Sequence, residues 1–472
     1  MESRATSPCV RAQGEVTTGN RRSGWRRALT RAMSLAAFVA CIWIPSLALA
    51  NNNAGLRTIP LHFSNHINQA QNLYIMIFGV INRDNGMGFP VGSNVYVTNT
   101  QGDVAITPAI PGNAPISLSL NVGMGTDNDV TLPKLSAVRI YSSIGAPLLV
   151  HTGNIAGGGI VTPTSQDPND PNFNTMFDFA ELTWVPQAAP PNHPEITTNL
   201  GINVTEVDSF GLPQQFTIEG TDPGTFQPNT ALTSGFLSTS RRPDLLNMLQ
   251  SFGPPWSGLI VGNGIRVRAL APNLGIAGGV FPGNYLDSYI NDIFLRYMSS
   301  PPLTATLSAA ADPNTVPNCP NPPTIIYNFT GSTAGGELVF SDATKGGAIF
   351  SLARWSTMDA YAGFFAYGSV VPTDSCQRPD FTAGEAVKAR LQAALMRSTV
   401  LVDPNLADNP NCPNPSTYYQ NQPLNKYAQL WHTAGIGGKA YSFGFDDNCS
   451  QSSFKLIFNP TKLTITLLGN RP

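Results

Sequence analysis

The hydrophobic pattern predicts strands at both ends of the chain. Residues 73–78 (Leu-Tyr-Ile-Met-Ile-Phe) are apolar on both faces, which is typical of a central strand buried on two sides. Residues 116–120 and 463–467 alternate apolar and polar side chains, so each predicts a strand with one solvent-facing side. The Arg-Asp-Asn-Gly sequence at 83–86 predicts a turn after the first of these strands.

Helical patterns lie in the middle of the chain. Residues 243–249 begin with proline and aspartate, which favour the first turn of a helix. Residues 285–294 and 385–397 repeat apolar side chains three and four positions apart, as one buried helix face requires. Each of these segments therefore predicts a helix.

The order of strands, helices and strands predicts a β-rich α+β protein. We expect residues 51–230 and 440–472 to form a β-barrel or sandwich domain, and residues 231–439 to form an inserted α/β domain. The 43 glycines and 40 prolines are consistent with many turns and long connections.

The first 50 residues differ in composition from the rest. They carry seven arginines and two acidic residues, followed by an apolar run over residues 32–49 and the sequence Ala48-Leu49-Ala50. This order predicts a secretory signal peptide. An uncleaved membrane anchor is the alternative, which Pro45 and the polar residues after position 50 disfavour. We expect a secreted protein, extracellular or periplasmic, without membrane contact after cleavage.

The charge balance bears on possible partners. The whole chain carries −2 and the first 50 residues carry 7 − 2 = +5, so the remainder carries about −7. A mildly acidic chain with only 12% charged residues argues against nucleic acid and anionic membranes as partners and suits a neutral polysaccharide. The oligomeric state is not readable from the sequence, and a monomer is the default expectation.

Cysteine usage agrees with secretion. Cys319, Cys376, Cys412 and Cys449 follow the predicted signal peptide, an even number that predicts two disulfides with three possible pairings. These cysteines form no C-x-x-C pair and the five histidines form no H-E-x-x-H motif, so we expect no metal or organic cofactor.

Two carboxylates stand out because their surroundings are apolar and strand-like. Glu181 lies in Phe-Ala-Glu-Leu-Thr-Trp, and Asp208 lies in Asn-Val-Thr-Glu-Val-Asp-Ser-Phe-Gly-Leu-Pro. Desolvation raises the pKa of a carboxyl group towards the range useful for proton transfer. A second carboxylate that stays ionised completes the pair that cleaves glycosidic bonds.

Glu206 lies two residues before Asp208. It is either a rival of Asp208 for the role of second carboxylate or a solvated charge at the rim of the site.

These two segments resemble the active-site stretch of glycoside hydrolase family 64, the β-1,3-glucanases built on a thaumatin-like fold. There a V-E-F-T-like segment and an N-T-[ST]-Q-V-D-x-F-G-x-P-like segment each carry a catalytic carboxylate. Residues 285–297, 389–397 and 426–447 are similar to further family segments, in the expected order. The chain departs from the family at Leu182, Met396 and Phe445, and its longer spacing between the carboxylates indicates an insertion at residues 186–198.

The resemblance implies a thaumatin-like β-barrel or sandwich domain and an inserted α/β lobe that flank a wide cleft. It also implies a secreted endo-β-1,3-glucanase that inverts anomeric configuration and acts on β-1,3-glucan. We expect Glu181 to be the general acid, desolvated by Leu182 and Trp184, and Asp208 to be the base that activates water. The reverse assignment stays open.

Further residues match polar positions near the family's cleft and are expected to bind sugar hydroxyls: Thr183, Asn203 and Thr205. Strand alternation places Asn203 and Thr205 on the face opposite Asp208, which argues against Thr205 unless this stretch bends. Asp446 and Asp447 lie in a segment shared with thaumatin-like proteins, where they either cap a turn or add charge to the cleft.

Two other functions remain open. A non-catalytic thaumatin-like protein that binds glucan would share the fold and the acidic cleft without turnover. A secreted structural or adhesive β-protein would have no cleft with paired acids.

Overall fold

The computed structural model describes residues 57–82, 90–107, 115–152, 160–263, 267–299, 301–311, 316, 319, 322–406 and 412–469. The predicted signal peptide and the predicted turn at 83–86 lie outside these residues. None of the described helices is long and apolar enough to cross a membrane.

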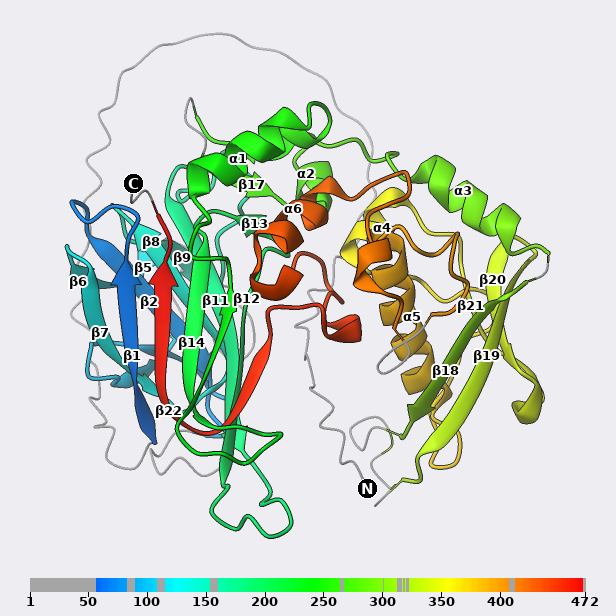
Figure 1. The fold of residues 1–472 in the computed structure, drawn as a ribbon, viewed down its shortest axis with the longest axis horizontal. Helices are drawn as coiled ribbons and strands as arrows, with labels where there is room; N and C mark the ends of the chain where they lie inside the picture. Colours follow the sequence, from blue (N-terminus) through cyan, green and yellow to red (C-terminus); the bar gives the residue numbers. More distant parts are fainter. Residues whose placement is uncertain are drawn as a thin grey trace, which may run out of the picture. The chain divides into compact units, whose positions relative to one another are not determined.

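Most described strands belong to one large sheet of twelve strands (Figure 1). Its main path runs β15-β14-β22-β12-β11-β8-β2-β3-β4, while β1 pairs with β22 and β7, and β6 pairs with β2. The bounds are β1 Thr58–Asn65, β2 Leu73–Val80, β3 Asn94–Val97, β4 Val104–Ile106, β6 Leu120–Gly123, β7 Asp127–Pro133, β8 Ser136–Ile144, β11 Met176–Pro186, β12 Thr198–Val204, β14 Gln214–Thr221, β15 Thr230–Gly235 and β22 Lys455–Leu467.

The strand predictions at 73–78 and 463–467 are confirmed. β2 lies between β8 and β3, and Ile75 and Ile77 enter one core while Met76 enters another. In β22, Leu463, Ile465 and Leu467 are buried and the threonines between them are partly exposed. The continuous apolar run at 73–78 and the alternation at 463–467 therefore identified these two strands and their buried faces.

The prediction of one strand at 116–120 is wrong. Residues 116–117 form β5 (Ile116–Ser117), which pairs with β9 (Leu149–Thr152), whereas Leu120 starts β6 in the large sheet. Between the two, Leu118 is buried against the core that contains Met76. β9 also pairs with β10 (Ile160–Val161), so a small sheet covers this part of the large one.

The helix predictions are confirmed with shifted starts. They correspond to α1 (Arg242–Ser251), α3 (Asp287–Arg296) and α5 (Asp380–Met396). Pro243 lies in the first turn of α1, and α5 starts five residues earlier than its apolar repeat. The remaining described helices are α2 (Pro272–Ala277), α4 (Thr357–Ala362), α6 (Lys426–Ala434) and short 3-10 turns at Trp256–Leu259, Ala343–Lys345, Pro415–Thr417, Ile436–Gly438 and Asn448–Ser450.

A second sheet accompanies these helices. Strands β18 (Leu303–Ala309), β19 (Ile325–Ala334), β20 (Glu337–Asp342) and β21 (Gly347–Leu352) follow one another in the sheet, and α5 packs against β18 and β21 (Figure 1). Their apolar side chains belong to a core separate from that of the large sheet. This order of elements matches the expected one, although the division into two domains stays a prediction.

Two disulfides are present, as predicted. They join Cys319 to Cys376 and Cys412 to Cys449.

The residues expected as an insertion form the end of a hairpin. β11 and β12 pair in register, from Ala180 opposite Val204 to Pro186 opposite Thr198. The residues between Pro186 and Thr198 connect the two strands. Within this connection His193 stacks on Phe226 with 3.9 Å between ring centroids, and the side chain of Asn459 donates to the Glu195 carbonyl. The connection starts five residues beyond Glu181, about 16 Å along the strand, so these contacts fix it at the far end of the hairpin.

Candidate active site

Glu181 lies in a row of side chains that crosses the large sheet. The register places Tyr96 of β3 opposite Phe78 of β2, Phe78 opposite Arg139 of β8, Arg139 opposite Glu181 of β11, and Glu181 opposite Asn203 of β12. Residues directly opposite each other in antiparallel strands project to the same face. Five strands thus present one aligned row around this carboxylate.

Arg139 holds Glu181 in place. The Arg139 Nε donates to Glu181 Oε1 at 2.9 Å, and its guanidinium lies 4.8 Å from the centroid of the Phe179 ring. Burial raises the pKa of Glu181, Arg139 opposes this rise, and the charge of Asp208 adds to it. The result is a pKa above the usual value, in a side chain that is still one-third exposed.

The expected source of this desolvation is wrong. Leu182 and Trp184 belong to the core on the opposite face of β11, because neighbouring strand residues point to opposite sides. On the face of Glu181 the apolar neighbours in register are Phe179 and, across on β8, Tyr141, whose rings are 4.9 Å apart. Burial raises the pKa of Tyr141 to about 12.

Asp208 approaches from a connecting segment. β12 ends at Val204, so strand alternation does not extend to residues 205–208, contrary to the sequence-based expectation. The Ala271 N–H donates to the Asp208 carbonyl at 2.9 Å, and the next two residues form β13 (Ser209–Phe210), which pairs with β17 (Arg268–Leu270). β17 also pairs with β16 (Ile260–Val261). The negative charge of Asp208 adds to the rise in the pKa of Glu181 and also contributes to the raised pKa of Arg139, so Asp208 lies near enough to this pair for their charges to interact.

Asp178 joins the segment after Asp208 to the strand of Glu181. It lies on β11 and is buried, and its Oδ2 accepts hydrogen bonds from the backbone N–H groups of Gly211 (2.8 Å) and Leu212 (3.0 Å). Its Oδ1 accepts from the N–H of Phe179 at 2.8 Å. Burial raises the pKa of Asp178 to about 7, and the three N–H donors limit the rise. One buried carboxylate thus connects the segment that carries Asp208 to the strand that carries Glu181.

Gly211 allows this connection because it has no side chain. A Cβ there would lie 2.0 Å from the carbonyl oxygen of Phe177, so only glycine lets the segment reach β11. Arg242 Nε donates to the Gly211 carbonyl at 2.6 Å from the other side. The glycine in the Phe-Gly-Leu-Pro motif therefore has a packing role.

The three predicted sugar-binding residues differ in accessibility. Thr183 is exposed, and its hydroxyl accepts from the Ala137 N–H at 3.3 Å. Asn203 is half-buried beside Glu181. Thr205 is buried, with its hydroxyl 3.5 Å from the Tyr441 carbonyl and 3.4 Å from the Val207 N–H. Thr183 and Asn203 thus share the face of Glu181, whereas Thr205 supports the loop from within.

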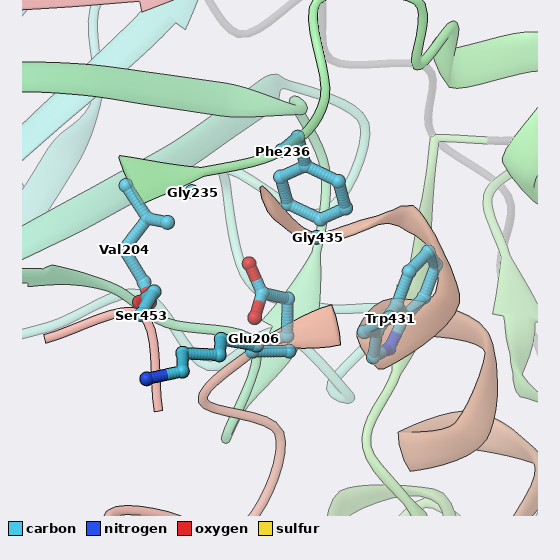
Figure 2. A pocket seen from close by; sticks show the side chains of 9 residues that line it. Val204, Glu206, Gly235, Phe236, Trp431, Gly435 and Ser453 are labelled. Atoms are coloured by element: carbon cyan, nitrogen blue, oxygen red, sulfur yellow. The ribbon is translucent and has the colours of Figure 1, made fainter. Parts of the chain in front are cut away.

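Glu206 is neither a rim charge nor an exposed rival of Asp208. It is buried, and Figure 2 shows its carboxyl group directed into an internal pocket between Val204 and Phe236. Burial, and then the charge of Asp178, raise the pKa of Glu206 well above its usual range. The Tyr427 hydroxyl donates to the Glu206 carbonyl at 2.7 Å. Glu206 is therefore a buried part of the support beneath the loop.

Asp446 belongs to the scaffold. It is fully buried and receives Arg397 Nη2 at 3.0 Å, His432 Nε2 at 2.9 Å and the Ser442 N–H at 3.0 Å. Burial alone would raise the pKa of Asp446, but His432, Arg397 and Ser442 together lower it. It does not contribute charge to a cleft.

Sequence reasoning missed Asp178 and Arg139. Strand alternation places Asp178 on the same face of β11 as Ala180, Leu182 and Trp184, which are apolar. An acid on an apolar strand face is the feature of the sequence that could have identified it. Arg139 had no comparable signal, because only the register of β8 with β11 brings it to Glu181. No cluster of three or more histidine, cysteine or acidic side chains suited to a metal ion occurs within the described ranges.

Comparison with known proteins identifies relatives of this arrangement. A family model described as β-1,3-glucanase, glycoside hydrolase 64, matches residues 57–467. Glucan endo-1,3-β-glucosidases of Arthrobacter sp. (strain YCWD3) and Cellulosimicrobium cellulans are each 28% identical over 341 residues, or 72% of this chain. The chain covers about half of each relative, 53% of its length.

Solved structures are similar over most of the chain. A laminaripentaose-producing β-1,3-glucanase in complex with laminaritetraose matches with a TM-score of 0.66 and 25% identity, over 87% of this chain and 98% of the other. A β-1,3-glucanase domain from Clostridium beijerinckii matches with a TM-score of 0.61 and 22% identity, over 88% and 98% of the two chains. The second likeness concerns the fold alone.

Proposed function

Since the chain belongs to glycoside hydrolase family 64, the β-1,3-glucanases, we propose that it is an endo-β-1,3-glucanase that hydrolyses β-1,3-glucan. The observation that carries this proposal is the placement of Glu181, which is partly exposed, paired with Arg139 and close enough to Asp208 for their charges to interact. Two carboxylates in one site are the catalytic equipment of most glycoside hydrolases.

Glu181 would act as the general acid and Asp208 as the base. The raised pKa of Glu181 supports this order, since an acid must hold its proton until it transfers it to the glycosidic oxygen. Asp208 would remove a proton from a water molecule as that water attacks the anomeric carbon from the opposite side. An inverting reaction of this kind places the two carboxyl groups roughly 6.5–9.5 Å apart.

Thr183 and Asn203 would bind sugar hydroxyls beside this pair, and Thr205 would contribute through the loop that it supports. The proposal includes a thaumatin-like β-domain, secretion after signal cleavage and a monomeric state. The two disulfides are consistent with an oxidising compartment.

One observation favours a second candidate, a glucan-binding protein without turnover. Arg139 contacts Glu181 at 2.9 Å, and a guanidinium at this distance stabilises the ionised carboxylate, which cannot donate a proton. Substrate binding must then weaken this pair before catalysis, or the site only binds.

The test is reducing-sugar release from laminarin and curdlan by the wild type, Glu181→Gln and Asp208→Asn. We expect cleavage by the wild type and a loss of about 10²–10⁴-fold in kcat for each variant, the usual contribution of an acid or base. Anomeric analysis of the first products by NMR tests inversion. A wild type that sediments with curdlan but releases no sugar would favour the binding protein.

A further inference from the structure

An exposed aromatic ring extends the cross-strand row beyond Asn203. Phe454 immediately precedes β22, and the antiparallel register that pairs Ile202 with Lys455 places Phe454 opposite Asn203. Opposite residues share a face, so Phe454 lies on the side of the sheet that carries Glu181. It is 41% exposed, which is unusual for a residue within a row that is otherwise half-buried.

Gly201 lets this ring lie against the backbone of β12. A Cβ at Gly201 would meet Cε2 and Cζ of Phe454 at 2.7 Å, so any side chain there would displace the ring. Gly201 lies within a regular strand and does not have a positive φ, so the backbone itself does not require glycine. Glycine inside a strand often marks a close approach of another group, and here that group is the Phe454 ring.

The distance from the reacting pair suits a neighbouring sugar. Phe454 and Glu181 are two strands apart, which corresponds to about 10 Å between their Cα atoms. Asn203 lies between them and offers an amide donor and acceptor. Thr183 lies opposite Gly201, so this exposed residue shares the face on which the ring lies.

We infer that Phe454 is a stacking platform for a glucosyl unit adjacent to the cleaved bond, and that the glucan chain runs across the strands along the row. A β-glucopyranosyl ring carries its ring C–H bonds axially, so each of its faces is apolar and fits a flat aromatic ring. The inference rests on the proposed function and specifies one subsite of it.

The experiment measures laminarin affinity by electrophoresis in laminarin-containing gels, and KM and kcat for laminarin, with the full chain. Phe454→Ala and Phe454→Leu should each weaken binding and raise KM roughly two- to tenfold, the range of one aromatic contact. Phe454→Tyr should retain wild-type affinity, because it keeps the flat ring. Phe364→Ala is the matched control, since Phe364 is 57% exposed in another part of the chain.

A second variant tests the geometry. Gly201→Ala should displace the ring and weaken laminarin binding as Phe454→Ala does, and the double variant should be no weaker than either single one. Circular dichroism and thermal unfolding establish that each variant is folded.

Unchanged laminarin affinity in folded Phe454→Ala, or equal losses in Phe454→Ala and Phe364→Ala, would overturn the platform while leaving the glucanase proposal intact. A wild type that neither binds nor cleaves laminarin or curdlan would overturn the proposed function and the platform with it.

Discussion

Two arginine–carboxylate pairs in this protein have nearly the same length and opposite properties. Arg139 Nε lies 2.9 Å from Glu181 Oε1, both side chains are about one-third exposed, and the pKa of Glu181 is raised. Arg397 and Asp446 are 3.0 Å apart and almost completely buried, and the pKa of Asp446 is lowered. The presence of an arginine therefore does not decide the protonation behaviour of either acid.

The number of donors makes the difference. Asp446 accepts hydrogen bonds from Arg397, His432 and both the N–H and hydroxyl of Ser442. His432 also donates through Nδ1 to the Gly438 carbonyl at 2.8 Å, which holds its ring beside Asp446. Glu181 accepts from Arg139 and has the negative Asp208 nearby. A carboxylate that accepts hydrogen bonds from several donors stays ionised and stabilises the scaffold, whereas a carboxylate with few donors can exchange a proton.

The largest effect is expected from breaking the buried pair. Arg397→Met keeps much of the side-chain length but removes the guanidinium that donates to Asp446. We expect a loss of about 3–5 kcal/mol in the free energy of unfolding, because one partner of a buried pair is left behind. Denaturant titration measures it, and Arg397→Lys, which keeps the charge, should lose less. A stability equal to wild type in Arg397→Met would contradict the scaffold role of this pair.

A smaller effect is expected from Asp178, which resembles Asp446 in burial but supports Asp208. Asp178→Ala removes the acceptor for three backbone N–H groups and releases the 209–212 segment. We expect kcat to fall about 10- to 100-fold through misplacement of Asp208, with little change in KM. Asp178→Asn keeps one acceptor oxygen and should recover part of kcat. A rise in KM as large as the expected fall in kcat, with kcat itself unchanged, would contradict a positioning role.

The pH dependence of stability gives an independent check on Asp178. Its pKa is raised from 3.8 to about 7, so between these values the folded protein binds more protons than the unfolded chain. Stability from this group is therefore lost as the pH rises from about 4 to 7. Asp178→Asn should make this decline shallower, as followed by denaturant titration at several pH values.

The sequence was sufficient for features that depend on local periodicity. The period of two along residues 179–184 correctly separates Glu181 and Thr183 from the buried Leu182 and Trp184. The proline and aspartate at the start of α1, and the even number of cysteines, likewise identified real features. In each case the physical cause lies within a few residues or in a simple count.

Features that depend on register or tertiary contact could not be read in this way. The alternation predicted for residues 203–208 stops at Val204, because the Glu206 N–H donates to the carbonyl of Tyr441, far along the chain. That contact holds Glu206 in a buried position, whereas the sequence alone allows either a rival carboxylate beside Asp208 or a solvated rim charge. The cation that opposes the rise in the pKa of Glu181 comes from β8, and only the pairing of Arg139 with Glu181 reveals it.

Removing Arg139 should change activity more than stability. Arg139→Met takes away the main contribution that lowers the pKa of Glu181, so this pKa should rise further. With Glu181 as general acid, the alkaline limb of the kcat/KM profile moves to higher pH; with Glu181 as base, the acidic limb moves instead. The free energy of unfolding should change by less than about 1 kcal/mol, since the pair is partly exposed. Arg354→Met is the matched control, because Arg354 also lies over an aromatic ring, 5.2 Å from the Phe294 centroid.

The smallest effect is expected from removing one of the hydrogen-bond donors to Asp446. Ser442→Ala removes the hydroxyl that donates to Asp446 Oδ2 at 2.9 Å but leaves the backbone N–H, His432 and Arg397 in place. We expect a loss of about 1 kcal/mol in the free energy of unfolding and unchanged kcat and KM on laminarin. Because the pKa of folded Asp446 is below its usual value, its stabilisation is present above pH 4 or so and is lost as the pH falls through the folded pKa. With one donor fewer that pKa rises, so acid unfolding of Ser442→Ala should begin at a higher pH than in the wild type. An unchanged acid transition would mean that His432 and Arg397 alone keep Asp446 ionised, and that these two side chains rather than the full set of donors separate this acid from Glu181.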